Sequence, residues 1–186
     1  LDWLPRDKRT IDQIIFEKTS SLLNSKIIVS KQSSNEILKK ITNSVEKNSS
    51  KKLIFGNDFN YSLNENGFFY YEDKYGGLRL PLPNLEGEFQ LSNISTAIAT
   101  IRNIEKINIS DQNIINGIKK IKSIARFSEI KKGKLKNLVK NNKIYIDGSH
   151  NPLGASVLIK HLNSLKCNKH IILGMMSNKD HIEYIS

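Results

Sequence analysis

The turn at residues 147–152, Asp-Gly-Ser-His-Asn-Pro, constrains the fold of this chain more than any other stretch. Residues 143–146 before it include two isoleucines and a tyrosine, which is typical of a short buried strand. Residues 153–165 after it carry leucine and valine at helical spacing. Asn151 suits the N-cap of that helix and Pro152 its first position, where a missing N–H costs nothing. We therefore predict a strand-to-helix turn, the place where open parallel sheets bind ligands.

The turn holds an acid and a histidine, Asp147 and His150, with Ser149 between them. Three near neighbours in one tight turn rarely converge into a catalytic relay, and the nucleophile-elbow pattern is missing. A zinc site is disfavoured because the histidines and Cys167 lack ligand spacing. The chain also has no Gly-rich phosphate loop ending in Lys-Ser/Thr. The residues alone therefore indicate a polar sheet edge that binds an anion or a nucleotide.

The chain has 186 residues, a net charge of +11 and one cysteine. Its lysines are scattered without a pattern of stacking aromatics, so a solvated surface is favoured over nucleic-acid binding. It shows no secretory signal and no apolar run of membrane-spanning length, which favours a cytoplasmic protein without membrane contact. Because the chain starts at Leu1 and stops at Ser186 within regular patterns, we expect it to be a fragment of a longer protein.

Hydrophobic periodicity predicts an α/β chain. Helices are predicted at residues 11–23, 34–47, 91–104 and 111–121. A strand is predicted at 26–30, and Asn/Gly turns within 52–82 indicate a small antiparallel meander that starts with residues 53–55. In the third helix the expected buried residues are Leu91, Ile94, Ala97, Ile98 and Ile101.

A domain boundary is expected at residues 124–125, which divides the chain into 1–124 and 125–186. Beyond it, strands at 127–130 and 135–139 are predicted to form a hairpin turning at Gly133. A further strand at 170–173 would complete a right-handed βαβ unit with parallel strands. Lys179 and Asp180 would then lie near the same sheet edge as the turn at 147–152.

Two polar residues in the first domain have two interpretations each. Lys18 falls seven residues after Ile11, so it projects from the same, apolar face of its helix. Such a lysine usually extends its ammonium to the rim, but it can also be held in a site where desolvation favours the neutral, reactive amine. Asn93 lies beside Ala97 at the edge of the buried arc, where it either reaches a ligand or is simply exposed.

Five motifs occur in the order in which one enzyme family carries them. They are Asp2-Trp3-Leu4 through Glu17-Lys18, Leu80-Pro81-Leu82-Pro83 through Asn93, Ala125-Arg126-Phe127, the turn at 147–152, and Gly174-Met175-Met176 with Lys179-Asp180. Together they resemble the bifunctional folylpolyglutamate synthase/dihydrofolate synthase group of the Mur-type amide ligases. The correspondence covers most of the chain.

The resemblance implies a fold and an activity. Residues 1–124 would be the C-terminal part of a central, P-loop NTPase-like ATP-binding domain, and 125–186 the start of a Rossmann-like C-terminal domain. The activity would be an ATP- and Mg²⁺-dependent ligase in folate biosynthesis, monomeric as in the family. ATP would phosphorylate the carboxylate of dihydropteroate or folyl-glutamate, and L-glutamate would attack the acyl phosphate. The phosphate loop, the other metal ligands and the pterin site would lie upstream, so the fragment is expected to be inactive alone.

The resemblance also assigns roles to single residues. The family's counterpart of Lys18 is carbamylated and supports a metal ion. The counterpart of Asn93 contacts the adenine, that of Arg126 the ATP phosphates, and that of Asp147 the nucleotide. His150 either belongs to the same catalytic cluster or makes a hydrogen bond that stabilises the turn. Lys179 and Asp180 receive no role.

Several positions depart from the family pattern. Thr19-Ser20-Ser21 stands where Ala-Gly-Ile is usual, Phe89 where histidine is usual, and Ser149 where alanine is usual. Two other functions stay open. One is a cell-wall Mur ligase, against which the His-Asn-Pro motif argues, and the other is a non-catalytic module that binds a nucleotide or a polyanion.

Overall fold

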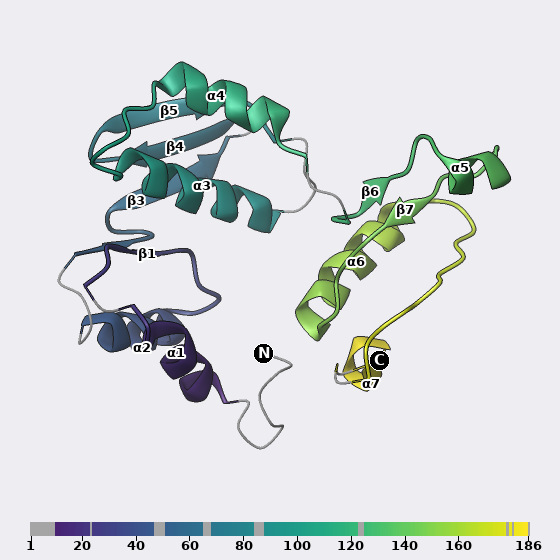
Figure 1. Cartoon of the computed structure of the whole chain (residues 1–186), viewed down its shortest axis with the longest axis horizontal. Helices are drawn as coiled ribbons and strands as arrows, with labels where there is room; N and C mark the ends of the chain where they lie inside the picture. The colour runs from purple at the N-terminus through teal and green to yellow at the C-terminus, as the bar shows by residue number, and fades with distance from the viewer. Residues whose placement is uncertain are drawn as a thin grey trace. The chain divides into compact units, whose positions relative to one another are not determined.

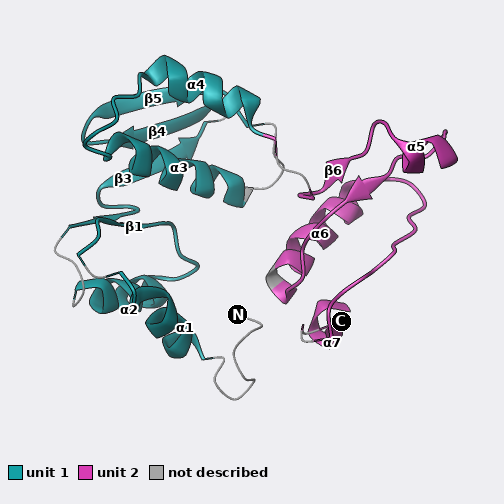
Figure 2. Cartoon of the chain, in the orientation of Figure 1, with its two compact units in different colours: residues 1, 3–121 teal, residues 2, 122–186 magenta. Residues whose placement is uncertain are grey.

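The computed structural model shows a mixed α/β chain (Figure 1). It describes residues 10–22, 24–46, 51–64, 68–83, 88–122, 125–177, 179 and 181–185. The chain forms two compact units, one ending at Ile121 and the other beginning at Lys122 (Figure 2). That the two units are parts of a P-loop NTPase-like and a Rossmann-like domain stays a prediction.

The first part of unit 1 joins two helices to a pair of parallel strands. In chain order it contains α1 (Ile11–Thr19), β1 (Ile27–Val29), α2 (Asn35–Glu46) and β2 (Lys52–Ile54). β1 pairs with β2 in parallel. Their side chains pack with α2 in a small core of Ile27, Val29, Val45 and Ile54. α1 is shorter than the predicted helix at 11–23, since it ends at Thr19.

The predicted antiparallel meander is present. It consists of β3 (Phe59–Leu63), β4 (Phe69–Asp73) and β5 (Gly76–Leu80), in that spatial order. The expectation that residues 53–55 begin the meander is wrong. Leu53 and Ile54 lie in β2 and pair with β1 instead. Three successive apolar residues without alternation suit a strand covered on both faces better than a meander strand.

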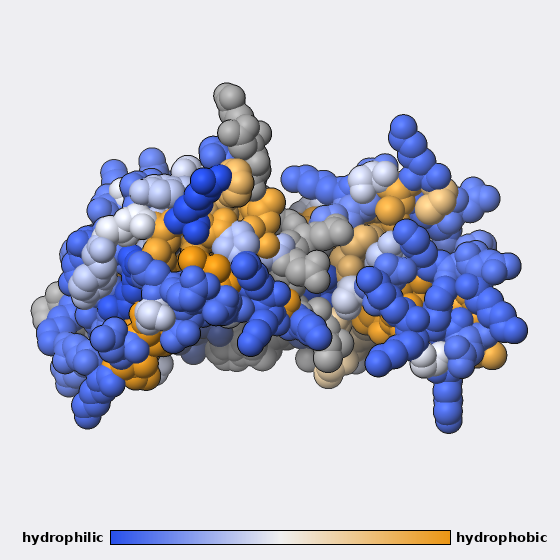
Figure 3. All heavy atoms as spheres, turned by 90° about the horizontal axis from the view of Figure 1, so that it is seen from above, coloured by the Kyte–Doolittle hydropathy of each residue, from blue (hydrophilic) through white to orange (hydrophobic). Residues whose placement is uncertain are grey.

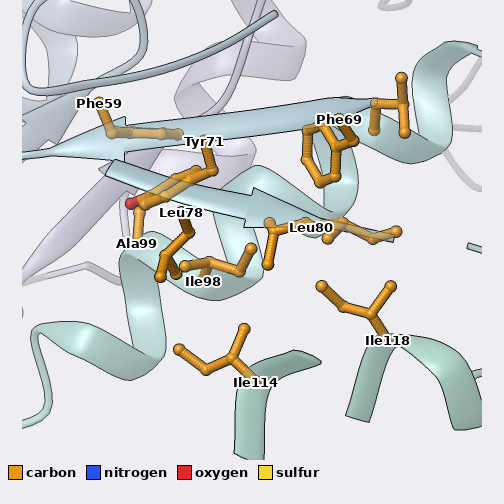
Figure 4. Close-up of a cluster of buried hydrophobic side chains, with 11 residues drawn as sticks. Phe59, Phe69, Tyr71, Leu78, Leu80, Ile98, Ala99, Ile114 and Ile118 are labelled. Atoms are coloured by element: carbon orange, nitrogen blue, oxygen red, sulfur yellow. The ribbon is translucent and has the colours of Figure 1, made fainter. Parts of the chain in front are cut away.

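Two helices, α3 (Glu88–Arg102) and α4 (Asp111–Lys120), complete the main core of unit 1. Figure 4 shows this core, in which strand and helix side chains meet: Phe59, Phe69, Tyr71, Leu78, Leu80, Ile98, Ala99, Ile114 and Ile118. Ala97, predicted to be buried, is exposed, whereas Ser95 and Ala99 are buried. The buried positions of α3 thus follow the helical spacing i, i+3, i+4, i+7, i+8 that starts at Leu91.

The β4–β5 hairpin carries two glycines with opposite constraints. A Cβ at Gly77 would lie 1.8 Å from Oη and 2.5 Å from Cζ of Tyr70, but both atoms are at the far end of an exposed side chain. A Cβ at Gly76 would meet nothing within 4 Å, but φ there is +109°. Only glycine adopts such a φ readily.

We expect Gly76→Ala to destabilise unit 1 by about 1–2 kcal/mol, because a positive φ is unfavourable for alanine. Gly77→Ala is expected to change stability by less than about 0.5 kcal/mol, because the Tyr70 ring can turn aside. Amide exchange of the β4–β5 peptides in the two variants measures both effects. A larger loss in Gly77→Ala would contradict this ranking.

Unit 2 has less regular structure. Its elements are β6 (Ser128–Glu129), α5 (Lys134–Leu138), β7 (Tyr145–Ile146), α6 (Pro152–Ser164) and α7 (His181–Ile185). β6 and β7 are antiparallel, and the N–H of Ile130 extends their pairing to the carbonyl of Ile144 at 2.8 Å. β6, which is shorter than the predicted strand at 127–130, therefore pairs with β7, the strand that leads into the turn.

Two predicted strands of unit 2 are wrong. Residues 135–139 form most of the short helix α5, because Gly133, with φ +111°, opens a helix rather than a hairpin turn. Residues 170–173 are not in a strand, and Ile172 is fully exposed at 100%. Within the described residues of this unit, β7 pairs with β6 alone, so the expected parallel βαβ unit is not formed.

The surface is mostly hydrophilic on the face that Figure 3 shows. Hydrophobic residues form smaller patches between the hydrophilic ones there (Figure 3). Among the described residues, no helix combines the length and the apolarity that crossing a membrane requires.

Candidate ligand-binding site at the Asp147 turn

The strand-to-helix turn forms where the sequence predicts it, between Ile146 of β7 and Pro152 of α6. Asn151 is the N-cap, and its Oδ1 accepts the N–H of Gly154 at 2.9 Å. Gly154 lets the turn approach the helix closely, because a Cβ there would lie 2.6 Å from Cβ of Ser149. A larger residue at this position would push the turn away from α6.

Asp147 uses both carboxylate oxygens to hold the backbone. Oδ1 accepts the N–H of Ser149 and Oδ2 accepts the N–H of Phe127, each at 2.8 Å. Burial raises the pKa of the Asp147 carboxyl, but hydrogen bonds from Ser149 and Phe127 and the charge of Arg126 outweigh burial and hold the pKa below its ordinary value. Asp147 is therefore ionised at neutral pH and binds two segments of unit 2 together.

The segment that Asp147 holds is the turn at residues 125–127. Ala125 and Phe127 have positive φ values of 60° and 46°. The carbonyl of Ala125 accepts the N–H of Gly148 at 2.8 Å, and the N–H of Ala125 donates to Oγ of Ser128 at 3.0 Å. Two motifs that the sequence singled out separately are thus joined by direct hydrogen bonds.

Arg126 lies between the two residues of positive φ. Its side chain is exposed and makes no hydrogen bond or ion pair within the part of the chain that the structure describes. Its charge nevertheless acts on Asp147, whose pKa it lowers. A permanently charged guanidinium has a planar fork of donors that matches a phosphate group. Arg126 is therefore the described residue of this site best suited to bind an anion.

Sequence reasoning missed an aromatic stack that involves Phe127, the residue after this arginine. The ring of Phe127 stacks with those of Tyr145 and His161, at centroid distances of 4.7 and 5.1 Å and interplanar angles of 8° and 13°. The three residues come from the turn, from β7 and from α6. No periodic pattern links them, so only the pairing of β6 with β7 could have suggested part of the stack.

The turn does not form a Ser-His-Asp relay. Oγ of Ser149 lies 2.7 Å from Oη of Tyr184 in α7, and Nδ1 of His150 lies 3.0 Å from the carbonyl oxygen of Gly148. Asp147 holds two backbone amides instead. The contact of His150 with its own turn supports the turn-stabilising interpretation of this exposed histidine.

In unit 1, Lys18 lies on the exposed side of α1. The buried side consists of Ile15 and Thr19, and Oγ1 of Thr19 lies 2.6 Å from Oγ of Ser44 in α2. Ile11, which shares the side of Lys18, is 45% exposed. The expectation that Lys18 projects from a buried apolar face is therefore wrong, because Thr19 at the next position faces α2.

The sequence also singled out Asn93, Lys179 and Asp180. Asn93 is exposed on α3, and its Nδ2 donates to Oε1 of the buried Gln90 at 3.4 Å. Lys179 is half-buried, and its N–H donates to the carbonyl of Met176 at 3.0 Å. Asp180 lies outside the described residues. Of the predicted site residues, the structure brings Arg126, Asp147 and His150 together within unit 2.

Within the described ranges, no group of three or more His, Cys, Asp or Glu side chains is placed to hold a metal ion. An exposed lysine such as Lys18 supplies no ligand until it is modified. The Mg²⁺ expected from the sequence stays a prediction.

A scan against protein-family models and a search of curated proteins by sequence found no match. Solved structures do match. E. coli FolC in complex with DHPP and ADP has a TM-score of 0.74 and 24% identity, and the match covers 99% of this chain and 41% of that one. A bifunctional folylpolyglutamate synthase/dihydrofolate synthase with Mn, AMPPNP and L-glutamate bound has a TM-score of 0.77 and 21% identity, with 100% and 42% covered.

A third structure, an FPGS-AMPPCP-folate complex, is 26% identical with a TM-score of 0.65, and the match covers 86% of this chain and 39% of that one. The chain therefore has the fold of a contiguous part of these enzymes and spans about two fifths of their length. The family resemblance found in the sequence is confirmed by these structural neighbours.

Proposed function

We propose that this chain is part of an ATP-dependent amide ligase of folate metabolism. The reaction joins L-glutamate to dihydropteroate or to a folyl-glutamate. The observation that carries the proposal is the contact between the turn at 125–127 and the turn at 147–152, which presents Arg126 beside an ionised Asp147. The fold shared with ligases solved with ADP, AMPPNP, folate or L-glutamate supports the same class of reaction.

The proposed reaction has two steps. A carboxylate oxygen of the acceptor attacks the γ-phosphorus of ATP, the bond to the β-phosphate oxygen breaks, and an acyl phosphate and ADP result. The amine of L-glutamate then attacks the acyl carbon, phosphate leaves with the bonding electrons, and the amine loses its proton to solvent. Charge accumulates on phosphate oxygens in the first step, and positively charged donors stabilise it.

The residues of this chain take the following proposed roles. Arg126 binds the ATP phosphates through its exposed guanidinium, and Asn93 contacts the adenine. Asp147 serves the nucleotide site from the second domain, and His150 stabilises the turn there. Lys18 carries a carbamate that supports a divalent cation, Mg²⁺ in the cell, once the other ligands are present. A bare amine at Lys18 in ¹³C NMR of the active, metal-loaded enzyme would contradict this last role.

The full-length protein tests the function directly. We expect ADP release only when L-glutamate is present together with dihydropteroate or tetrahydrofolate. ATP binding without acceptor-dependent ADP release would contradict the ligase and support a binding module. Turnover with a cell-wall muropeptide precursor instead of a pteroate would support the Mur alternative. An upstream Gly-Thr-x-Gly-Lys-Gly-Ser-like loop in the reading frame would favour a ligase over a module.

A further inference from the structure

The backbone around Arg126 is strained on both sides. Ala125 and Phe127 have φ values of 60° and 46°, in the left-handed region that residues with a Cβ rarely occupy. Each such residue costs about 1–2 kcal/mol, and a bulky aromatic is an outlier there. Strain of this kind persists only where surrounding contacts enforce it, and it is concentrated at functional sites.

The contacts that enforce this conformation come from the Asp147 turn and from the aromatic stack. Asp147 accepts the N–H of Phe127, and Gly148 donates its N–H to the carbonyl of Ala125, each at 2.8 Å. The rings of Tyr145 and His161 both stack with the Phe127 ring. The backbone on either side of Arg126 is thus fixed while its guanidinium stays exposed.

We infer that Asp147, together with the Tyr145–Phe127–His161 stack, is a positioning device that presents Arg126 to the phosphates of the bound nucleotide. In this role Asp147 acts on Arg126 through the turn at 125–127. This inference rests on the phosphate-binding role proposed for Arg126.

Two physical arguments support a positioning role. Each oxygen of Asp147 already accepts a short hydrogen bond from a backbone amide, so its geometry is set by the two turns. A flexible arginine on a mobile loop loses conformational entropy when it binds, and fixing its backbone in advance removes part of that cost. The strain at Ala125 and Phe127 is offset by hydrogen bonds and stacking in unit 2 before any ligand binds.

A double-mutant cycle in the full-length ligase tests the inference. In Asp147→Asn an amide group replaces one of the two oxygens that accept N–H groups, so the turn loosens. We expect the KM for ATP to rise about tenfold in Asp147→Asn, with kcat less affected. In the Arg126→Ala background the same change is expected to have no further effect, because Asp147 acts through Arg126. Effects that multiply would show that Asp147 contributes independently, and would overturn the inference.

A second measurement does not depend on catalysis. Trypsin cleavage after Arg126 is expected to be severalfold faster in Asp147→Asn and in Phe127→Ala, which removes the ring from the stack, than in the wild type. Glu129→Gln removes a nearby charge from β6 without touching the turn, and it is expected to be cleaved at the wild-type rate. Unchanged cleavage in both turn variants would overturn the positioning device. Faster cleavage in a protein without ligase activity would instead leave the device intact and contradict the proposed function.

Discussion

Arg126→Ala is expected to lower kcat/KM for ATP by about 100-fold or more in the full-length protein, the range found when one charge-stabilising donor is removed from an active site. We assign this loss to the missing phosphate contact, because the Arg126 guanidinium is exposed and makes no hydrogen bond or ion pair in the described part of the chain. Removing it therefore breaks no internal hydrogen bond of unit 2. The loss is expected to appear in ATP-dependent steps, with folding unchanged by circular dichroism.

Two further variants sharpen this result. Arg126→Lys keeps the charge but not the planar fork, and is expected to recover part of the activity. Arg79→Ala removes an arginine of unit 1 whose Cζ lies 3.6 Å from the centroid of the Phe68 ring. It is expected to leave turnover unchanged, because its partner is an exposed aromatic ring. Activity of Arg126→Ala within threefold of the wild type would contradict the phosphate-binding role.

The sequence predicts the local features of this site well. A polar N-cap followed by proline specifies the start of α6 by itself, and the Asn/Gly turns indicate the meander strands. The helices α2, α3 and α4 follow from apolar spacing to within a few residues. In each case the information lies in neighbouring residues.

Features that depend on distant partners could not be predicted in this way. Asp147 acts on the backbone of Phe127, twenty positions earlier, and no pattern in the sequence records that hydrogen bond. His161 looks like one more position of a helix until the stack is seen. Residues 170–173 are apolar enough for a buried strand, but a strand also needs a neighbour, and apolar composition does not show whether one pairs with it.

The packing of unit 1 depends on one arginine at the end of α3. Arg102 donates to Oδ1 of Asp73 at 2.9 Å, to the carbonyl of Gly76 at 3.0 Å and to Oδ1 of Asp111 at 2.8 Å. The side chains of Arg102 and Asp73 are 9% and 3% exposed, whereas that of Asp111 is 60% exposed. Oδ2 of Asp73 also accepts the hydroxyl of Tyr71 at 2.9 Å. Burial and the neighbouring Asp73 raise the pKa of that hydroxyl, so it stays protonated and donates.

We expect Arg102→Ala to destabilise unit 1 by about 3 kcal/mol or more, because it leaves the Asp73 carboxylate buried without its cation. Asp111→Asn breaks the exposed end of the same network and is expected to cost less than about 1 kcal/mol. Hydrogen exchange of the peptides from β4, β5 and α4 measures both changes in the full-length protein. If the lost charge pair is the cause, Arg102→Met in an Asp73→Asn background recovers much of the stability, since no buried charge then lacks a partner. An equal loss in Arg102→Ala and Asp111→Asn would show instead that the exposed contact carries the stabilisation.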